Sequence, residues 1–245
     1  MATQVDVFST AHAFSEDELK GKVVVVVDVL RAGSTITTAL VNGARGVIPV
    51  ADMGEASKIA GNLDSSNYLL CGEHNGHRID GYKLGNSPLE YQRESVEDKT
   101  IILKTTNGTG AIRRSHLAKK VIVATFLNLG RVIEELEEAE TEVLLVCAGT
   151  RNRLAIEDIL CAGAIVYGLT GGQLDGHETD GAKVAYSLYE KFGDNIYDVL
   201  KHSNHGEWLI NEFGDVDISF CSKLNQMPVL PVWKEGVIRL VDGSK

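Results

Sequence analysis

A carboxylate directly follows the most apolar stretch of the chain. Residues 22–38 read KVVVVVDVLRAGSTITT, so five valines lead into Asp28, and Arg31, Ser34 and Thr35 come soon after it. A carboxylate at a strand end can hold Mg²⁺, attack phosphorus as a nucleophile or act as a general base. Arginine offers a forked donor for a phosphate or carboxylate, and the hydroxyls beside a helix start can donate to an anion. The alternative is that Asp28 and Ser34 only cap a helix beginning near residue 35.

A second polar segment, TTNGTG at 105–110, lies between an apolar run and a helical pattern. Its glycines let backbone amides approach an oxyanion closely, which favours a phosphate-binding turn. No Gly-Lys-Ser/Thr follows, so the segment is not a Walker loop. An ordinary strand-to-helix turn with a threonine cap is the alternative. The substrate-binding candidates here are Thr105, Thr106, Asn107, Gly108 and Thr109.

A third polar segment follows the apolar run that ends in CAG, and it reads TRNRLAIEDIL. Arg151 and Arg153 indicate a local positive pocket for an anionic substrate, although a solvated helix start with salt bridges is the alternative. Glu157 and Asp158 fall within the expected helix, where adjacent side chains point about 100° apart. We therefore expect at most one of these two carboxylates to face the cleft and the other to be exposed.

The fourth segment, CGEHNGHRIDGYKLGNSP, supplies Glu73 as a candidate metal ligand and Asn86 as a candidate substrate contact. Two histidine pairs have a spacing of three residues, namely His74 with His77 and His202 with His205. No matching cysteine or histidine pair occurs at a telling spacing, so a zinc site is not expected. Mg²⁺ prefers oxygen ligands and usually takes one or two carboxylates with water and substrate phosphate.

Together, these segments predict a Mg²⁺ site and a phosphate-binding cleft. Asp28, Glu73 and one of Glu157 or Asp158 are the expected metal ligands, and Asp28, Arg31 and Glu73 are the expected catalytic residues. Such a site would take a small anionic phosphorylated substrate, because the metal and the arginines offset its charge.

The elements that must position these residues alternate between strands and helices. Six short β-branched runs, each followed by a loop and in most cases by a helical pattern, lie at 23–27, 46–52, 67–73, 100–106, 120–126 and 141–149. This alternation predicts a three-layer α/β/α fold with a largely parallel or mixed sheet, in which ligands bind beyond the carboxyl ends of the strands. Residues 74–88 are expected to form an ordered lid, the chain after 175 is expected to be helical, and the last segment a strand or hairpin. No linker divides residues 1–245, so we expect one domain.

A possible internal repeat appears at a shift of about 120 residues. VVVVDVLRAGSTITTALVNGA then lies over LLVCAGTRNRLAIEDILCAGA, with Val26 over Val146 and Arg31 over Arg151. Either the fold contains two related halves or two buried strand–loop–helix units have converged on one pattern.

The amino-acid composition argues against some classes of binding partner. The net charge of −10 argues against nucleic acid and anionic membranes, but a local arginine cluster still allows an anionic substrate. The four cysteines form no C-x-x-C pair, which favours buried, reduced thiols and a cytoplasmic protein. The start of the chain shows no signal-peptide pattern, and no apolar run has the length of a membrane span. A homodimer is expected only because symmetric dimers are common among enzymes.

Four blocks in order give a family resemblance. DVLRAGST at 28–35, DGYKLGNSPLEY at 80–91, TTNGTGA at 105–111 and CAGTRNRLAIEDILCAGAI at 147–165 together resemble the 2-phosphosulfolactate phosphatase, or ComB-like, family over nearly the whole chain. The resemblance implies Mg²⁺-dependent hydrolysis of 2-phospho-3-sulfolactate to 3-sulfolactate and phosphate, a step of coenzyme M biosynthesis in archaea. The site residues it implies are Asp28, Arg31, Glu73, Asn86, Thr106, Asn107, Arg151 and one of Glu157 or Asp158.

The chain departs from the family pattern at two places. His74 follows Glu73 where an arginine is common, and Ala32-Gly33-Ser34 stands where a threonine-rich stretch is common. These departures bear on the substrate more than on the fold or the reaction type.

Two questions about function stay open at this point. Asp28 either forms an aspartyl-phosphate or holds Mg²⁺ while a water activated by the metal attacks phosphorus. The rival function is a non-catalytic binder or sensor of a small anionic metabolite, which would need neither Mg²⁺ nor turnover. The carboxylates beside the arginines argue against that rival, because a pure anion binder gains nothing from them.

Overall fold

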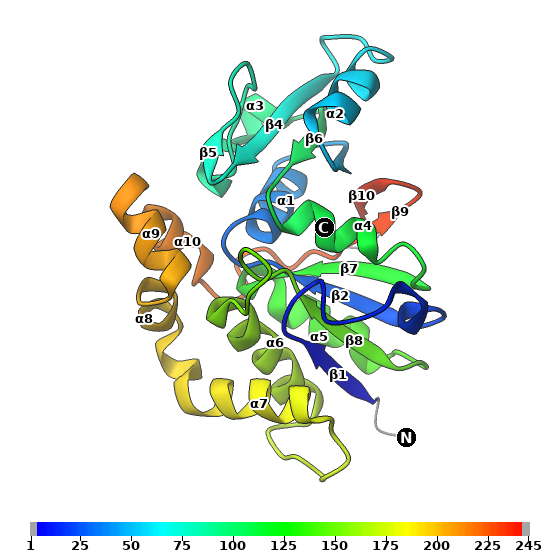
Figure 1. The fold of residues 1–245 in the computed structure, drawn as a ribbon, viewed down its shortest axis with the longest axis vertical. Coiled ribbons are helices and arrows are strands. Elements are labelled where there is room, and N and C mark those ends of the chain that lie inside the picture. The colour runs from blue at the N-terminus through cyan, green and yellow to red at the C-terminus, as the bar shows by residue number, and fades with distance from the viewer. Residues whose placement is uncertain (1–3, 242–245) are drawn as a thin grey trace.

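Ten strands form one mixed sheet in the order β1-β8-β2-β7-β9-β10-β3-β6-β4-β5 (Figure 1). The computed structural model describes residues 4–241. Strands β1, β8, β2 and β7 are mutually parallel, as are β3, β6 and β4, whereas β5 and the β9–β10 hairpin pair in antiparallel fashion. The strands are Val5–Phe8 (β1), Val23–Val27 (β2), Gly46–Val50 (β3), Tyr68–His74 (β4), His77–Arg78 (β5), Thr100–Lys104 (β6), Lys120–Ala124 (β7), Val143–Cys147 (β8), Pro231–Lys234 (β9) and Val237–Leu240 (β10).

Helices cover both faces of this sheet, which confirms the three-layer α/β/α fold. Helices α5 to α10 pack on one face of the β1-β8-β2-β7 group, and α1, α3 and α4 contribute to a core on the opposite face. Helix α2 packs separately against β3 and β6. The helices are Ala32–Val41 (α1), Met53–Ala60 (α2), Arg93–Val96 (α3), Gly108–Arg114 (α4), Leu129–Glu137 (α5), Ile156–Leu169 (α6), Asp180–Phe192 (α7), Ile196–Lys201 (α8), Asn204–Phe213 (α9) and Val216–Cys221 (α10), with 3₁₀ turns at Glu16–Leu19 (η1), Pro88–Glu90 (η2), Phe126–Asn128 (η3) and Gly193–Asn195 (η4).

The valine run of β2 lies at the centre of the parallel group and is buried on both faces. Val23, Val25 and Val27 pack into one core, and Val24 and Val26 pack into the other. Side chains alternate across a strand, so a strand covered on both faces must be continuously apolar. This is why the run leads to a rigidly held strand end.

All six strands expected from the apolar runs are present, and most end earlier than expected. The β3 run, for example, ends at Val50 rather than at residue 52. The short strand β1 was not anticipated, because its four residues include an aspartate and give little pattern. The segment at 74–88 is ordered as expected: Ile79 and Leu84 are buried, and Leu84 forms a bridge to Cys71 beside β4. The C-terminal hairpin is also confirmed, although it lies inside the sheet.

The two segments of the possible repeat are neighbours in the sheet. Strand β2 pairs with β8 in parallel, and the pairing joins Val26 to Val146, the same shift of 120 residues. Both units therefore lie in one parallel group of strands, not one in each half of the molecule. Duplication stays a prediction.

Two simpler expectations concern cysteines and membrane spans. All four cysteines are buried and free of disulfides. Within residues 4–241, none of the helices has both the length and the apolar character needed to cross a membrane.

Candidate active site

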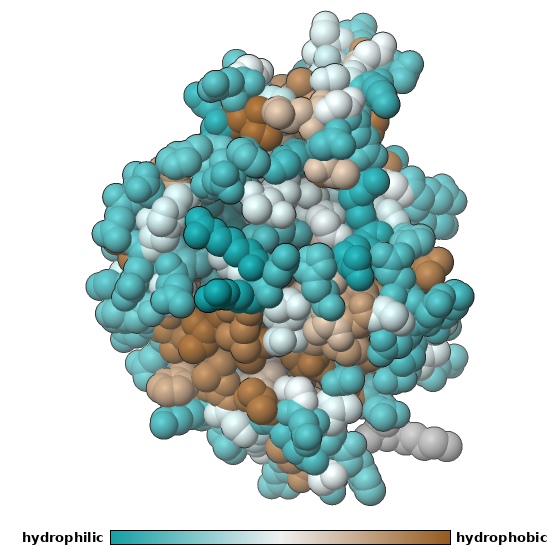
Figure 2. Space-filling view, in the orientation of Figure 1, coloured by the Kyte–Doolittle hydropathy of each residue, from teal (hydrophilic) through white to brown (hydrophobic). Residues whose placement is uncertain are grey.

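A pocket of about 860 Å³ opens beyond the carboxyl ends of β2, β4, β6 and β8, where the sequence predicted a cleft. Figure 2 shows hydrophilic side chains gathered across the middle of this face, next to a hydrophobic area over α6. Five segments line the pocket: 28–32 after β2, 73–76 at the end of β4, 105–108 after β6, 150–157 after β8, and 202–208 at the corner between α8 and α9, together with Asn86.

Asp28 lies at the floor of the pocket and is almost fully buried. Its Oδ1 accepts the backbone N–H of Ala32 at 3.0 Å, so the carboxylate does cap the first turn of α1. Its Oδ2 lies against Gly108, where a Cβ would come within 2.4 Å of that oxygen. No group within residues 4–241 donates a hydrogen bond to Oδ2. Asp28 therefore combines the capping role with a free oxygen for a ligand, and Gly108 is needed for the close approach of the β6–α4 turn.

The pKa of Asp28 is raised from 3.8 to about 6, and burial is the main cause. The carboxylates of Glu73 and Glu157 raise it further, whereas His205 and the N–H of Ala32 oppose the shift. Three carboxylates thus converge on one water-poor site. Such an arrangement favours a bound cation or a proton, because either relieves the repulsion.

Glu73 ends β4 inside the pocket, but its oxygens are already engaged. The backbone N–H and the hydroxyl of Thr106 donate to it, and the backbone N–H of Gly76 donates at 2.6 Å. Glu73 therefore joins the β4 exit to the β6 exit and holds Thr106 in the lining.

Glu157 and Asp158 are both buried at the start of α6, so the expectation that one would be exposed was wrong. Glu157 lines the pocket, and its Oε1 lies 3.6 Å from Nδ1 of His205. Asp158 points behind the lining and accepts the backbone N–H groups of Val29 at 2.9 Å and Gly149 at 3.0 Å. Burial and the neighbouring carboxylates raise its pKa well above the usual range. Asp158 is therefore a brace between two strand ends and lies outside the pocket lining.

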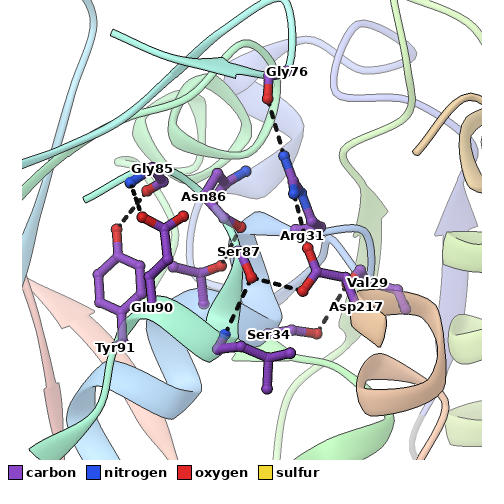
Figure 3. A network of polar contacts seen from close by, with 12 residues as sticks. Val29, Arg31, Ser34, Gly76, Gly85, Asn86, Ser87, Glu90, Tyr91 and Asp217 are labelled. Carbon is purple, nitrogen blue, oxygen red and sulfur yellow. Dashed lines mark hydrogen bonds and ion pairs between the residues drawn. The ribbon is translucent and has the colours of Figure 1, made fainter. Parts of the chain in front are cut away.

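Arg31 lines the pocket but does not carry an unpaired charge. Its guanidinium donates to Oδ2 of Asp217 at 2.8 Å and to the carbonyl of Gly76 at 3.1 Å (Figure 3). The guanidinium also lies over the ring of Phe213. The expected free anion clamp is thus already balanced by a buried carboxylate on α10.

Arg151 and Arg153 are exposed at the pocket rim, on a tight turn. Thr150 and Arg153 exchange both backbone hydrogen bonds, and Arg151 and Asn152 between them have positive φ angles of 52° and 60°. Positive φ at both central positions is the type I′ geometry of two-residue hairpins. Within the described part of the chain, neither guanidinium forms an ion pair. The pocket rim therefore carries the positive charge that the sequence predicted for this segment.

Three predicted substrate contacts lie behind the lining. Helix α1 starts at Ala32, three residues earlier than expected, so the hydroxyls of Ser34 and Thr35 are fully buried. Ser34 donates to the carbonyl of Val29 and Thr35 to that of Asn86. Thr109 exchanges hydrogen bonds with Thr105 across the first turn of α4. These three residues support the pocket and do not line it.

The other predicted contacts do line the pocket, namely Asn86, Thr105, Thr106, Asn107 and Gly108. Asn86 is the most informative of them. It is buried, and its Oδ1 has no hydrogen-bond partner. Buried acceptors are almost always paired, so an unpaired one that lines a pocket indicates a ligand contact.

The structure adds a wall that the sequence reading missed. His202, Asn204, His205 and Trp208 line the pocket from α8 and α9. The sequence reading considered His205 only as part of a histidine pair unsuited to zinc. In the structure, His205 lies between Glu157 and Thr150, and its Nδ1 is 3.4 Å from the Thr150 hydroxyl oxygen. His74, at the position that departs from the family pattern, is exposed and outside the lining. Polar residues beside an amphipathic helix were the available signal, but nothing local links them to strand ends more than 50 residues away.

One family model matches a stretch of the chain that includes every residue lining the pocket. The family model described as 2-phosphosulpholactate phosphatase matches residues 8–236. A protein of Caldanaerobacter subterraneus subsp. tengcongensis is 40% identical over 95% of this chain and 96% of its own length. A protein of Thermotoga petrophila is 44% identical over 88% of this chain and 91% of its own, and one of Clostridium perfringens is 41% identical over 98% of both. Each of the three is named probable 2-phosphosulfolactate phosphatase.

Proposed function

This chain belongs to the 2-phosphosulpholactate phosphatase family, and we propose that it hydrolyses 2-phospho-3-sulfolactate to 3-sulfolactate and inorganic phosphate. One observation carries the proposal. The buried carboxylates Asp28, Glu73 and Glu157 line a pocket whose rim holds two exposed arginines, and neither arginine has a carboxylate partner in the part of the chain that the structure describes. A site with negative groups at its floor and positive groups at its mouth suits a cation-assisted reaction of a polyanionic ester.

The donor set fits Mg²⁺ held by two carboxylates. Within residues 4–241, no group of three or more histidine, cysteine or acidic side chains is arranged to hold a metal by itself. Mg²⁺ needs fewer protein ligands, because it keeps waters and binds substrate phosphate. Among the residues that the structure describes, Asp28 Oδ2 accepts no hydrogen bond and Glu157 accepts no N–H donor, so these two residues would hold the ion. Glu73 already accepts three donors and fits a supporting role. When bound, Mg²⁺ would neutralise phosphate charge and polarise the P–O bond.

The remaining residues have roles that follow from their positions. Arg151 and Arg153 are placed to receive the sulfonate and carboxylate, the two anionic groups that stay on the product. The turn at 105–108 and Asn86 also line the pocket, and we assign them to the phosphate end of the substrate. Arg31 is an oriented set of donors close to Asp28. Buried donors held in place stabilise developing charge better than mobile ones.

Two routes for Asp28 are distinguishable. In one, Asp28 attacks phosphorus, the ester oxygen leaves with a proton, and water then cleaves the acyl phosphate. In the other, water attacks directly and Asp28 only holds the cation. We favour the second, because Oδ1 is fixed by Ala32 and no second aspartate follows two residues later, where Leu30 stands. Rapid-quench sampling of a single turnover decides: a trapped phosphoenzyme would establish the covalent route.

The first experiment measures phosphate release from 2-phosphosulfolactate, phospholactate and phosphoglycolate, each with Mg²⁺ and with EDTA. We expect Mg²⁺-dependent turnover with preference for the sulfonated ester. Turnover of the other esters alone would keep the phosphatase and reject the substrate. Binding of the esters without release, independent of Mg²⁺, would instead establish the non-catalytic binder. We also propose a cytoplasmic location, which four buried free thiols support.

A further inference from the structure

Asp217 on α10 reaches the pocket wall from the C-terminal part of the chain. It is buried, with 4% of its surface exposed. One carboxylate oxygen accepts from Arg31 at 2.8 Å, and the other accepts from the hydroxyl of Ser87 at 2.6 Å (Figure 3). Asp217 thus joins two segments of the pocket that lie 186 and 130 residues away from it in sequence.

Contacts on several sides fix the guanidinium of Arg31. Asp217 holds one terminal nitrogen, the carbonyl of Gly76 holds the other, and the ring of Phe213 lies 5.2 Å from the guanidinium carbon. An arginine has five N–H donors, and two are engaged here by groups within residues 4–241. The Phe213 ring and Asp217 both come from the C-terminal helices, so this segment decides how the remaining three N–H groups are oriented.

The second contact of Asp217 fixes the turn that presents Asn86. Ser87 donates to Asp217 and also accepts the N–H of Leu89 at the start of η2. Its neighbour Asn86 is held by Thr35 through the backbone carbonyl, while the Asn86 side chain keeps an unpaired oxygen at the pocket. One carboxylate therefore sets the orientation of two pocket residues.

We propose that Asp217 is a positioning residue for the reaction, acting through Arg31 and through the Asn86–Ser87 turn; the proposal rests on the proposed phosphatase function. Stability alone does not explain the pair well, since a buried ion pair often stabilises a fold no more than apolar residues of the same size. The location does explain it, because Arg31 lines the pocket and Ser87 is the chain neighbour of Asn86, which also lines it.

Neutral and conservative variants test the proposal. We expect Asp217→Asn to lower kcat about 30-fold with KM changed less than about 3-fold, because misplaced donors weaken transition-state stabilisation more than ground-state binding. Ser87→Ala, which leaves the ion pair intact, should lower kcat about 3-fold. Asp217→Glu should recover part of the loss by restoring the charge. The matched control is Asp215→Asn, an exposed aspartate at the start of the same helix whose carboxylate accepts from the hydroxyl of Tyr197, and it should behave as wild type.

A double-mutant cycle separates positioning from a structural role. If Asp217 acts through Arg31, then Asp217→Asn should cause little further loss of kcat in an Arg31→Gln background. Additive losses would overturn the proposal, as would wild-type kcat in Asp217→Asn. Thermal unfolding is measured for every variant. If Asp217→Asn fails to fold, Ser87→Ala and Asp217→Glu decide, and wild-type kcat in both would overturn the proposal.

Failure of the proposed function would give a different result. If wild-type protein releases no phosphate from any of the three esters, binding of inorganic phosphate with Mg²⁺ is measured by calorimetry instead. Weaker phosphate binding by Asp217→Asn than by Asp215→Asn would then keep Asp217 as a positioning residue of a binding site. Equal affinities would reject it.

Discussion

The exits of β2 and β8 align at a shift of 120 residues and are adjacent in the sheet, yet their aligned arginines have different environments. The 120-residue shift that aligns the two segments is also the register of their pairing, and it aligns Arg31 with Arg151. Arg31 is buried against Asp217, whereas Arg151 is exposed and has no ion-pair partner within residues 4–241. The same residue type at aligned positions therefore occurs in two settings: one arginine is a buried, fixed donor and the other is an exposed charge.

The difference arises from what covers each exit. Helices α9 and α10 and the β4–β5 turn close over the β2 exit, and Gly76 packs so tightly on Trp208 that a Cβ would come within 2.1 Å of the ring. The β8 exit forms its own two-residue turn and stays open. The local sequence places an arginine at each strand exit, but segments distant in sequence determine whether that arginine is buried or exposed.

Asp158 links the two exits directly. It accepts the N–H groups of Val29 and Gly149, which are equivalent positions under the same shift. One carboxylate thus holds both strand ends at a fixed separation beneath the pocket. Because Asp158 holds the backbone of both exits, a side-chain substitution at one exit should leave the backbone of the other in place. The two exits can therefore be compared by mutation.

The largest effect should come from the carboxylate that only the β2 exit has. Ala148 stands where Asp28 would have its counterpart, so nothing at β8 can replace it. We expect Asp28→Asn to lower kcat/KM at least about 10³-fold while the fold is retained, because removal of a buried charge costs little stability when its pKa is already raised. Phosphate release and urea unfolding measure the two quantities. Activity above a tenth of wild type would show that Asp28 is only a cap.

A smaller effect should distinguish the two arginines. Arg31→Lys loses the forked contacts to Asp217 and Gly76, so we expect kcat to fall about 30-fold. Arg151→Lys keeps a charge at an exposed rim, and its kcat should stay within about 2-fold of wild type. Steady-state kinetics on both variants tests this contrast. Equal losses would mean that the two exits contribute alike and that the buried pairing of Arg31 has no special role.

Removing charge from the open exit should affect binding alone. We expect Arg151→Ala and Arg153→Ala each to raise KM about 5-fold with kcat nearly unchanged, since an exposed cation contributes modest, salt-screened attraction. The KM increase should shrink at 0.5 M NaCl, where the wild-type protein also loses the benefit. The denaturation midpoints should match that of wild type, and a large loss of stability would contradict the free position of these side chains.

The smallest effect concerns stability and pH in the metal-free protein. The folded pKa of Asp28 is about 6, above its unfolded value of 3.8, so the folded state binds more protons between these values. The free energy of unfolding should therefore decrease as pH rises through this window and then level off. Asp158 contributes in the same direction. Urea unfolding in EDTA from pH 4 to 7 should show a flatter profile for Asp28→Asn, and an unchanged profile would contradict the buried titration.

Sequence alone predicted well which polar residues follow the buried strands and reach the pocket. Burial on both faces leaves a clear apolar run, and the polar residue after it stands out. Asp28, Glu73 and the turn at 105–108 were found this way, and all of them line the pocket. It was harder to predict from the sequence which side of a helix faces the pocket. Sequence could not tell which of Glu157 and Asp158 faces the pocket, and the expectation that the other would be exposed was wrong, because both are buried and the partners of Asp158 come from other segments.

The contribution of the C-terminal helices could not be read from local patterns. His205, Trp208 and Asp217 lie on helices whose amphipathic pattern indicates packing but not the surface on which they pack. Ser34 and Thr35 show the opposite error, since hydroxyls near a strand end looked reactive but fell inside a helix that began earlier. Tertiary placement decided the first case, and the earlier start of α1 decided the second.

The β9–β10 hairpin also bears on how the protein is made. This last segment of the chain lies between β7 and β3, where Ile122 pairs with Val232 and Val47 with Ile238. The two parallel groups of strands therefore cannot join through this hairpin until residues 231–240 have been synthesised and have left the ribosome. Until then, β7 and β3 are open edges, and exposed apolar edges are templates for association with other chains. The sheet is thus closed by a segment that is made after both parallel groups, and a chain truncated before residue 231 would carry both edges permanently.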